Sequence, residues 1–113
     1  MELIVILTTV ASLEEAHKIA NTLVVQSLVA CANISRIESI YSWKGEVQND
    51  QEFRIMLKTT KAQYPAVESV IRELHSYELP AIYAMAIEHA YEPYAAWVGQ
   101  CVTGGENIAT DSA

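Results

Sequence analysis

The sequence predicts an α+β domain, a ferredoxin-like split βαβ sandwich in the element order βαββαβ with a short C-terminal helix. Three observations predict it: an apolar run near the N-terminus, two segments with apolar residues at helical spacing, and a long strand-like stretch between them. Right-handed crossovers place both long helices on one face of such a sheet. The 113 residues fit one domain, which we assign to residues 1–103, followed by a flexible C-terminal tail at 104–113.

The first strand and the first helix are predicted at the N-terminal end. Leu3–Leu7 is continuously apolar, which is typical of a strand covered on both faces. Ser12 is a candidate helix N-cap, and Glu15, three residues later, completes a capping box. The helix is expected to continue to about Val29, with a buried face formed by Ala16, Ile19, Ala20 and Leu23.

A long β-hairpin is predicted from Ala32 to Thr60. Asn49–Asp50 is the strongest turn signal in this stretch, and Gly45 is interpreted as a kink or bulge. The second strand alternates cleanly, with one face formed by Phe53, Ile55 and Leu57. The first strand carries more apolar surface than one protomer can cover, because apolar residues fall on both of its faces: Ile34, Ile37, Ile40, Tyr41 and Trp43.

The remaining elements follow from proline positions and apolar spacing. A second helix begins near Pro65, which the first turn of a helix tolerates, and ends before Pro80. A final strand is expected at Ile82–His89, where residues of both faces are mostly apolar. Pro93 then permits a short helix that carries Tyr94 and Trp97.

The composition restricts the partners and the compartment. A net charge of −7 argues against nucleic acid and against anionic membrane surfaces, both of which need a basic face. The hydrophobic fraction of 51% is high, so part of the apolar surface is expected between subunits. Leu3–Leu7 is too short for an export signal or a membrane span, and we expect a cytoplasmic protein. There, Cys31 and Cys101 would both be free thiols.

No pattern typical of an enzyme occurs in the sequence, which lacks a phosphate-binding glycine loop, GxSxG and HExxH. A small ferredoxin-like hydrolase of acyl phosphates would need Arg and Gly in an anion-binding loop, but Thr8–Ser12 supplies neither. An RNA-recognition domain of the same strand order would need paired aromatic and basic residues on the sheet. Phe53 is the only phenylalanine, and the charge is acidic.

One turn combines groups that can carry chemistry. His75–Pro80 brings an imidazole, the phenol of Tyr77 and the carboxylate of Glu78 onto a turn that Pro80 stiffens. Imidazole and carboxylate can bind a divalent transition metal. The alternative interpretation is a helix C-terminus at which the histidine interacts with the last carbonyl groups.

Four segments, taken together in this order and spacing, resemble motifs of the CutA family, and the resemblance covers nearly the whole chain. These segments are Leu28–Ile34, similar to LAACxNI, Ser39–Gly45, similar to SxYxWxG, Leu57–Thr59, similar to IKT, and His75–Pro80, similar to HPYExPE.

The resemblance implies a ferredoxin-like protomer similar to the PII signalling proteins, assembled as a homotrimer through its long hairpins. Tyr41 and Trp43 would then lie at or near the subunit contacts. The resemblance also implies a binding or signalling role linked to tolerance of divalent metal ions, copper in particular, with no established catalytic activity and no required cofactor. The alternative is a PII-like sensor of a small ligand or nucleotide that binds no metal.

The metal site implied by the resemblance would be built from a Cys, a His and a Glu, of which this chain keeps only His75. Glu78 is a further candidate ligand as the nearest carboxylate in sequence, and Cys31 is one if the fold brings its sulfur close. The family commonly has Glu where this chain has Ala81, and some members have Cys in the region of Thr8. Because two donors are replaced, we expect any Cu²⁺ or other divalent cation to be bound weakly.

Overall fold

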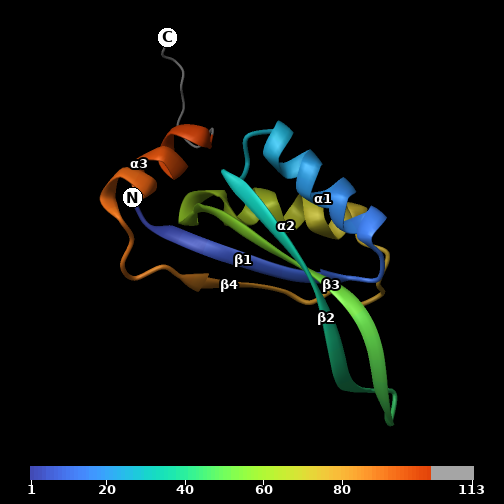
Figure 1. Cartoon of the computed structure of the whole chain (residues 1–113). Coiled ribbons are helices and arrows are strands. Elements are labelled where there is room, and N and C mark those ends of the chain that lie inside the picture. The colour runs from blue at the N-terminus through green and yellow to red at the C-terminus, as the bar shows by residue number, and fades with distance from the viewer. Residues whose placement is uncertain (103–113) are drawn as a thin grey trace.

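The computed structural model describes residues 1–102. Over these residues, strands and helices follow one another in the predicted order, with a short 3₁₀ turn at Lys61–Gln63 before the second helix (Figure 1). The elements are β1 (Leu3–Val10), α1 (Leu13–Val25), β2 (Cys31–Trp43), β3 (Glu46–Thr60), α2 (Tyr64–Leu74), β4 (Ile82–Ala86) and α3 (Glu92–Cys101).

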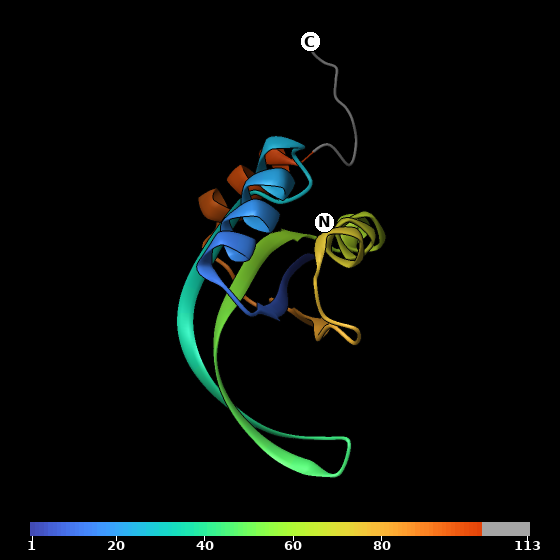
Figure 2. The same cartoon turned by 90° about the vertical axis from the view of Figure 1, so that its right-hand side faces the viewer.

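The four strands form one sheet in the order β2-β3-β1-β4, and every neighbouring pair is antiparallel. The helices α1 and α2 lie side by side on one face of this sheet (Figures 1 and 2). This is the predicted ferredoxin-like arrangement, so the fold class is confirmed. No helix within residues 1–102 is long and apolar enough to cross a membrane.

The main core lies between the sheet and the two helices. One face of β1 and β3 meets the apolar faces of α1 and α2 there, and the largest fully buried side chains are Ile6, Ile19, Leu23, Ile55, Leu57 and Ile71. A second, smaller cluster lies beneath α3 and contains Leu3, Ala30 and Val98. Complete burial of an aliphatic side chain contributes about 1.5–3 kcal/mol, so these clusters hold the helices to the sheet.

The hairpin turn differs from the prediction. Trp43 pairs with Glu46, which leaves Lys44 and Gly45 as a two-residue loop. Both have positive φ, 52° and 84°, as a type I′ turn requires. Asn49–Asp50, predicted as the turn, lies inside β3, and Gly45 is the turn residue and not a kink. The primed turn matches the twist of the strands, which outweighs the local turn preference of an Asn-Asp pair.

A helix and a strand were also predicted to be longer than they are. The helix α1 ends at Val25 and not at Val29, because Ser27 adopts a left-handed conformation with φ of 59°. The Leu28 N–H then donates to the Leu23 carbonyl, which closes the helix with the bond pattern of a Schellman motif. The last strand ends at Ala86 and not at His89. The predicted tail at 104–113 lies outside the described residues.

The hairpin extends beyond the rest of the sheet. β1 pairs with β3 only from Phe53 to Thr60, so residues 37–43 of β2 and 46–52 of β3 project past it. We call this projecting part the arm and the part of the hairpin within the sheet the root. The arm extends away from the helices, and its end bends round beneath the rest of the molecule (Figures 1 and 2); it contributes to the longest molecular dimension, 52 Å.

Candidate binding site between the arm and the turn after α2

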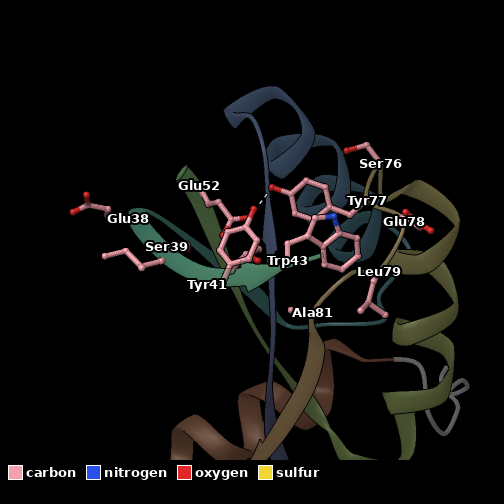
Figure 3. A pocket seen from close by; sticks show the side chains of 12 residues that line it. Glu38, Ser39, Tyr41, Trp43, Glu52, Ser76, Tyr77, Glu78, Leu79 and Ala81 are labelled. Atoms are coloured by element: carbon pink, nitrogen blue, oxygen red, sulfur yellow. Dashed lines mark hydrogen bonds between the residues drawn. The ribbon is translucent and has the colours of Figure 1, made fainter. Parts of the chain in front are cut away.

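A cavity of about 840 Å³ lies where the base of the arm faces the turn that follows α2 (Figure 3). Its walls come from the end of β1, from β2 and β3, and from the turn of residues 76–81. The lining residues are Thr9, Glu38, Ser39, Ile40, Tyr41, Trp43, Glu52, Ser76, Tyr77, Glu78, Leu79 and Ala81.

Strand geometry places the aromatic side chains of the arm. Side chains of alternate residues point to the same face, so Tyr41 and Trp43 share the face of β2 that carries Ser39. Glu52 belongs to the same face, because it pairs with Ile37 in the register of β2 and β3. In Figure 3 the rings of Tyr41, Trp43 and Tyr77 gather around the cavity.

His75 fixes the beginning of the turn to β1. Its side chain is completely buried, and its Nε2 donates to the Thr9 carbonyl at 2.8 Å. Its Nδ1 accepts from the Tyr77 backbone N–H at 3.1 Å. A carbonyl can only accept and an N–H can only donate, so the imidazole is the neutral Nε2–H tautomer. Both ring nitrogens are therefore used in holding the turn.

Glu15 fixes the same turn from the side of α1. Its carboxylate accepts from the Ser76 backbone N–H at 2.8 Å and from the Ser76 hydroxyl at 3.0 Å. The predicted capping box is thus only half formed. The Ser12 hydroxyl accepts from the Glu15 N–H at 3.1 Å as expected, but the Glu15 side chain binds the turn and not Ser12. The turn offers both an N–H and a hydroxyl, which is a better pair of donors than one N-cap amide.

A buried carboxylate forms part of the cavity wall. Glu52 is only 6% exposed, and the Tyr77 hydroxyl donates to its Oε2 at 2.6 Å. Desolvation, and then this hydrogen bond, raise the pKa of the Tyr77 hydroxyl. The Tyr41 hydroxyl makes a similar bond to Asp50 Oδ2 at 2.6 Å, which raises the pKa of Tyr41, but this pair is exposed.

The predicted metal ligands are not gathered in one place. Within residues 1–102 no group of three His, Cys, Asp or Glu side chains could hold a metal ion. Glu78 lines the cavity, but His75 does not, and its nitrogens are occupied. The Cys31 thiol lies 3.8 Å from Asn33 Oδ1 and 4.0 Å from the Tyr94 hydroxyl, at the opposite end of β2 from the arm. Metal binding stays a prediction, and this geometry does not favour it.

Neither cysteine takes part in a disulfide. Cys31 and Cys101 are both free and partly buried. Burial, and then the nearby Cys31, raise the pKa of the Cys101 thiol above its ordinary value. A raised thiol pKa lowers the fraction of reactive thiolate, so Cys101 is not arranged as a nucleophile.

The family model for the CutA1 divalent ion tolerance protein matches residues 4–101. The chain belongs to the CutA1 family. Among its relatives, the divalent-cation tolerance protein CutA of Thermus thermophilus is 41% identical over 95 residues, which cover 83% of this chain and 92% of that protein. The mouse protein CutA is 38% identical over 84% of this chain, but the match spans only 54% of the mouse protein. The family is named for ion tolerance and not for a catalysed reaction.

Solved structures of CutA1 proteins share the fold. The CutA structure from Archaeoglobus fulgidus, described there as a periplasmic divalent cation tolerance protein, superposes with a TM-score of 0.88 at 34% identity. The superposition covers 89% of this chain and 99% of the Archaeoglobus fulgidus chain. The CutA1 structure from Oryza sativa gives a TM-score of 0.89 at 29% identity, with 93% of this chain and 97% of that chain covered.

The sequence pointed to part of this site. Tyr41, Trp43, Tyr77 and Glu78, all singled out in the sequence, line the cavity, and Pro80 lies in the same turn. The predicted place of Tyr41 and Trp43 at subunit contacts and the predicted role of Glu78 as a metal ligand stay predictions. The sequence interpretation missed Glu52. It also missed the second role of Glu15. Neither role leaves a local signal, because each partner lies more than twenty residues away.

Proposed function

We propose that this protein is a homotrimeric, non-enzymatic binding or signalling module that takes up a small ligand in the cavity beside the arm, in a process linked to tolerance of divalent metal ions such as copper. In the trimer, a neighbouring subunit would close the open side of the cavity, and Tyr41 and Trp43 would lie at or near the subunit contact. We further propose a cytoplasmic location, which suits two free thiols.

The observation that carries this proposal is the apolar surface that one chain leaves uncovered. Large apolar side chains are exposed on the arm, on the turn after α2 and on β4, and they include Ile40 at 68%, Val47 at 78%, Leu79 at 70% and Met85 at 51%. Single exposed apolar residues are ordinary, but several on adjoining elements mark an interaction surface. Obligate subunit contacts are rich in this kind of surface.

Sedimentation equilibrium of the tag-free protein at micromolar concentration tests the assembly. We expect a mass three times that of the 12.5 kDa chain. Val47→Asp places a charge on the arm, where Val47 is 78% exposed and supports no core, so it should lower the mass while the circular dichroism spectrum is retained. Val25→Asp on α1 is the matched control, because Val25 is 80% exposed but distant from the arm. A monomer mass for the wild type would refute the trimer.

A thermal-shift screen of nucleotides and divalent metals, followed by titration of wild type and His75→Ala with Cu²⁺, tests the ligand and the metal. A ligand that binds only the native trimer raises the unfolding temperature. We expect Cu²⁺ to bind weakly and to be removed by a chelator without loss of the fold. Equal and tight Cu²⁺ binding by both proteins would place the metal site away from His75.

The second candidate function is a PII-like sensor of a small ligand or nucleotide that works without metal. Two observations favour it over a metal-binding role. The cavity has a volume typical of small-molecule sites, which run from roughly 300 to 1,000 Å³. In addition, the described residues contain no three-donor group for a metal ion. A thermal shift with a nucleotide, unchanged by chelator, would support this function.

A further inference from the structure

The cavity beside the arm combines aromatic rings with carboxylates. Three of its lining residues are aromatic and three are acidic, and none of the described residues that line it is Lys, Arg or His. The aromatic side chains are Tyr41, Trp43 and Tyr77, and the acidic ones are Glu38, Glu52 and Glu78. A lining with three carboxylates and, among the described residues, no cationic side chain favours a cation over an anion.

The positions of the carboxylates differ, and Glu52 matters most. Glu38 lies on the other face of β2 from Tyr41, and Figure 3 shows its side chain at the outer edge of the cavity. Glu78 lies across the aromatic rings from Glu38, on the turn. Glu52 is 94% removed from solvent, and the Tyr77 hydroxyl donates only to its Oε2. A carboxylate can accept at both oxygens, so Oε1 can accept from a ligand.

The aromatic rings supply the second half of a cation site. The faces of Trp and Tyr rings carry negative charge density and attract ammonium groups within about 6 Å of the ring centroid. The protein already shows this property at Trp43, because the Lys44 ammonium lies 5.7 Å from its ring centroid. A buried carboxylate beside such rings is stabilised when a cation enters, since the cation offsets the cost of its desolvation.

The separation of the carboxylates in the cavity favours an organic cation over a bare metal ion. A metal ion needs several donors within about 2–2.6 Å of one point, and the described residues offer no three-donor group. An aliphatic cation can reach separated carboxylates with its ammonium groups, while its methylene groups contact the rings and the apolar side chain of Leu79.

We propose that this cavity binds an aliphatic organic cation with terminal ammonium groups, the chemical class of diamines and polyamines. This inference rests on the proposed function, because it names the ligand class of the same cavity. Glu52 accepts from one ammonium group, Trp43 and Tyr41 hold the aliphatic chain, and Glu78 attracts the second charge at the rim.

Isothermal titration calorimetry of the full-length protein with putrescine and spermidine tests the proposal. Two controls match the probe: 1,4-butanediol has the length of putrescine without its charge, and Mg²⁺ has the charge without the aliphatic chain. We expect binding of both amines, weaker binding at higher salt, and no binding of the diol. Binding of the diol as tight as that of putrescine would overturn the proposal, as would amine binding no tighter than that of Mg²⁺.

Three variants locate the binding site. Glu52→Gln keeps an acceptor for the Tyr77 hydroxyl but removes the charge, and should weaken putrescine binding about tenfold or more. Trp43→Leu and the exposed Glu78→Gln should each weaken it roughly threefold to tenfold. The matched control is Glu73→Gln on α2, which makes the same change of net charge at an exposed residue outside the cavity. Equal weakening by Glu73→Gln would mean nonspecific charge attraction and would contradict the site.

The outcome also separates this inference from the proposed function. If the amines do not bind but a nucleotide or another small molecule does, and Glu78→Gln or Trp43→Leu alters that binding, the cavity is a ligand site and only the ligand class is wrong. If no tested ligand binds and the trimer is intact, the binding role itself fails.

Discussion

The root and the arm of the β2–β3 hairpin share one ladder of backbone hydrogen bonds, but their apolar side chains differ in burial. In the root, Ile55 and Leu57 are completely buried between the sheet and the two helices. In the arm, Ile40 and Val47 are exposed by 68% and 78%. The backbone pairing continues with the same register through both. A two-stranded ribbon alone is marginally stable in water, so the arm depends on the root and on its turn, and in the proposed trimer it would also depend on a neighbouring subunit.

The cavity lies between the arm and the turn after α2. Its wall on the turn side is held by hydrogen bonds of His75 and Glu15, whereas its wall on the arm side carries partly exposed rings. In the proposed trimer, a second subunit would complete the arm side of the cavity. The comparison therefore predicts which substitutions change the fold and which change only the assembly.

The largest effect is expected in the root. Ile55→Ala removes a fully buried side chain and should lower the free energy of unfolding by about 2–5 kcal/mol at every protein concentration. Val47→Ala in the arm should cost less than about 1 kcal/mol, and its effect should decrease on dilution. Urea unfolding at two protein concentrations measures both. Equal losses at Ile55 and Val47 would remove the distinction between root and arm.

The next effect concerns two hydroxyl–carboxylate bonds of equal length. Tyr77→Phe leaves the buried Glu52 without its donor and should lower stability by about 1–3 kcal/mol. Tyr41→Phe breaks a bond of the same 2.6 Å length to exposed Asp50, and should change stability little because water replaces the donor. Urea midpoints of the two variants decide this. A loss in Tyr41→Phe as large as in Tyr77→Phe would show that the Tyr41–Asp50 pair is buried in solution.

The pH dependence of the same pair has a definite sign. Because the folded pKa of Tyr77 is raised above its ordinary value of 10.0, its contribution to stability is complete below pH 10 and is lost as the pH rises towards the folded pKa. Wild type should therefore lose more stability than Tyr77→Phe between about pH 8 and about pH 11. Urea unfolding at each pH measures the stability of both proteins. Curves of stability against pH that run parallel would contradict the raised pKa.

The smallest effects are expected for two glycines, one in the turn of the arm and one in the helix α3. Gly45→Ala should cost about 1–2 kcal/mol, because φ is 84° and a Cβ there would meet nothing within 4 Å, so the cost is in the backbone alone. Gly99→Ala in α3 should be near neutral, since its Cβ would approach only the side chain of Met1, which is 76% exposed and can move. Thermal unfolding compares the pair. A larger loss for Gly99→Ala would reverse this ranking.

Much of the fold could be predicted from local patterns. The order of elements, the buried face of β3, the start of α1 at Ser12 and Pro65 in the first turn of α2 were all confirmed. Each of these features depends on residues close in sequence, and the spacing of these residues is enough to predict which side chains share a face. Of the cavity residues, the sequence singled out only those that belong to the motifs, such as Tyr41 and Trp43, and their place at subunit contacts stays a prediction.

The sequence by itself determined the fold class, because this depends on local apolar spacing, and its four motifs carried the resemblance to the family. Only the tertiary structure decided where the hairpin turns, what Glu15 binds, and that Glu52 is buried beside Tyr77. Two physical reasons account for these three cases. The twist of paired strands selected the Lys44–Gly45 turn, and hydrogen bonds between residues distant in sequence form only after the chain has folded.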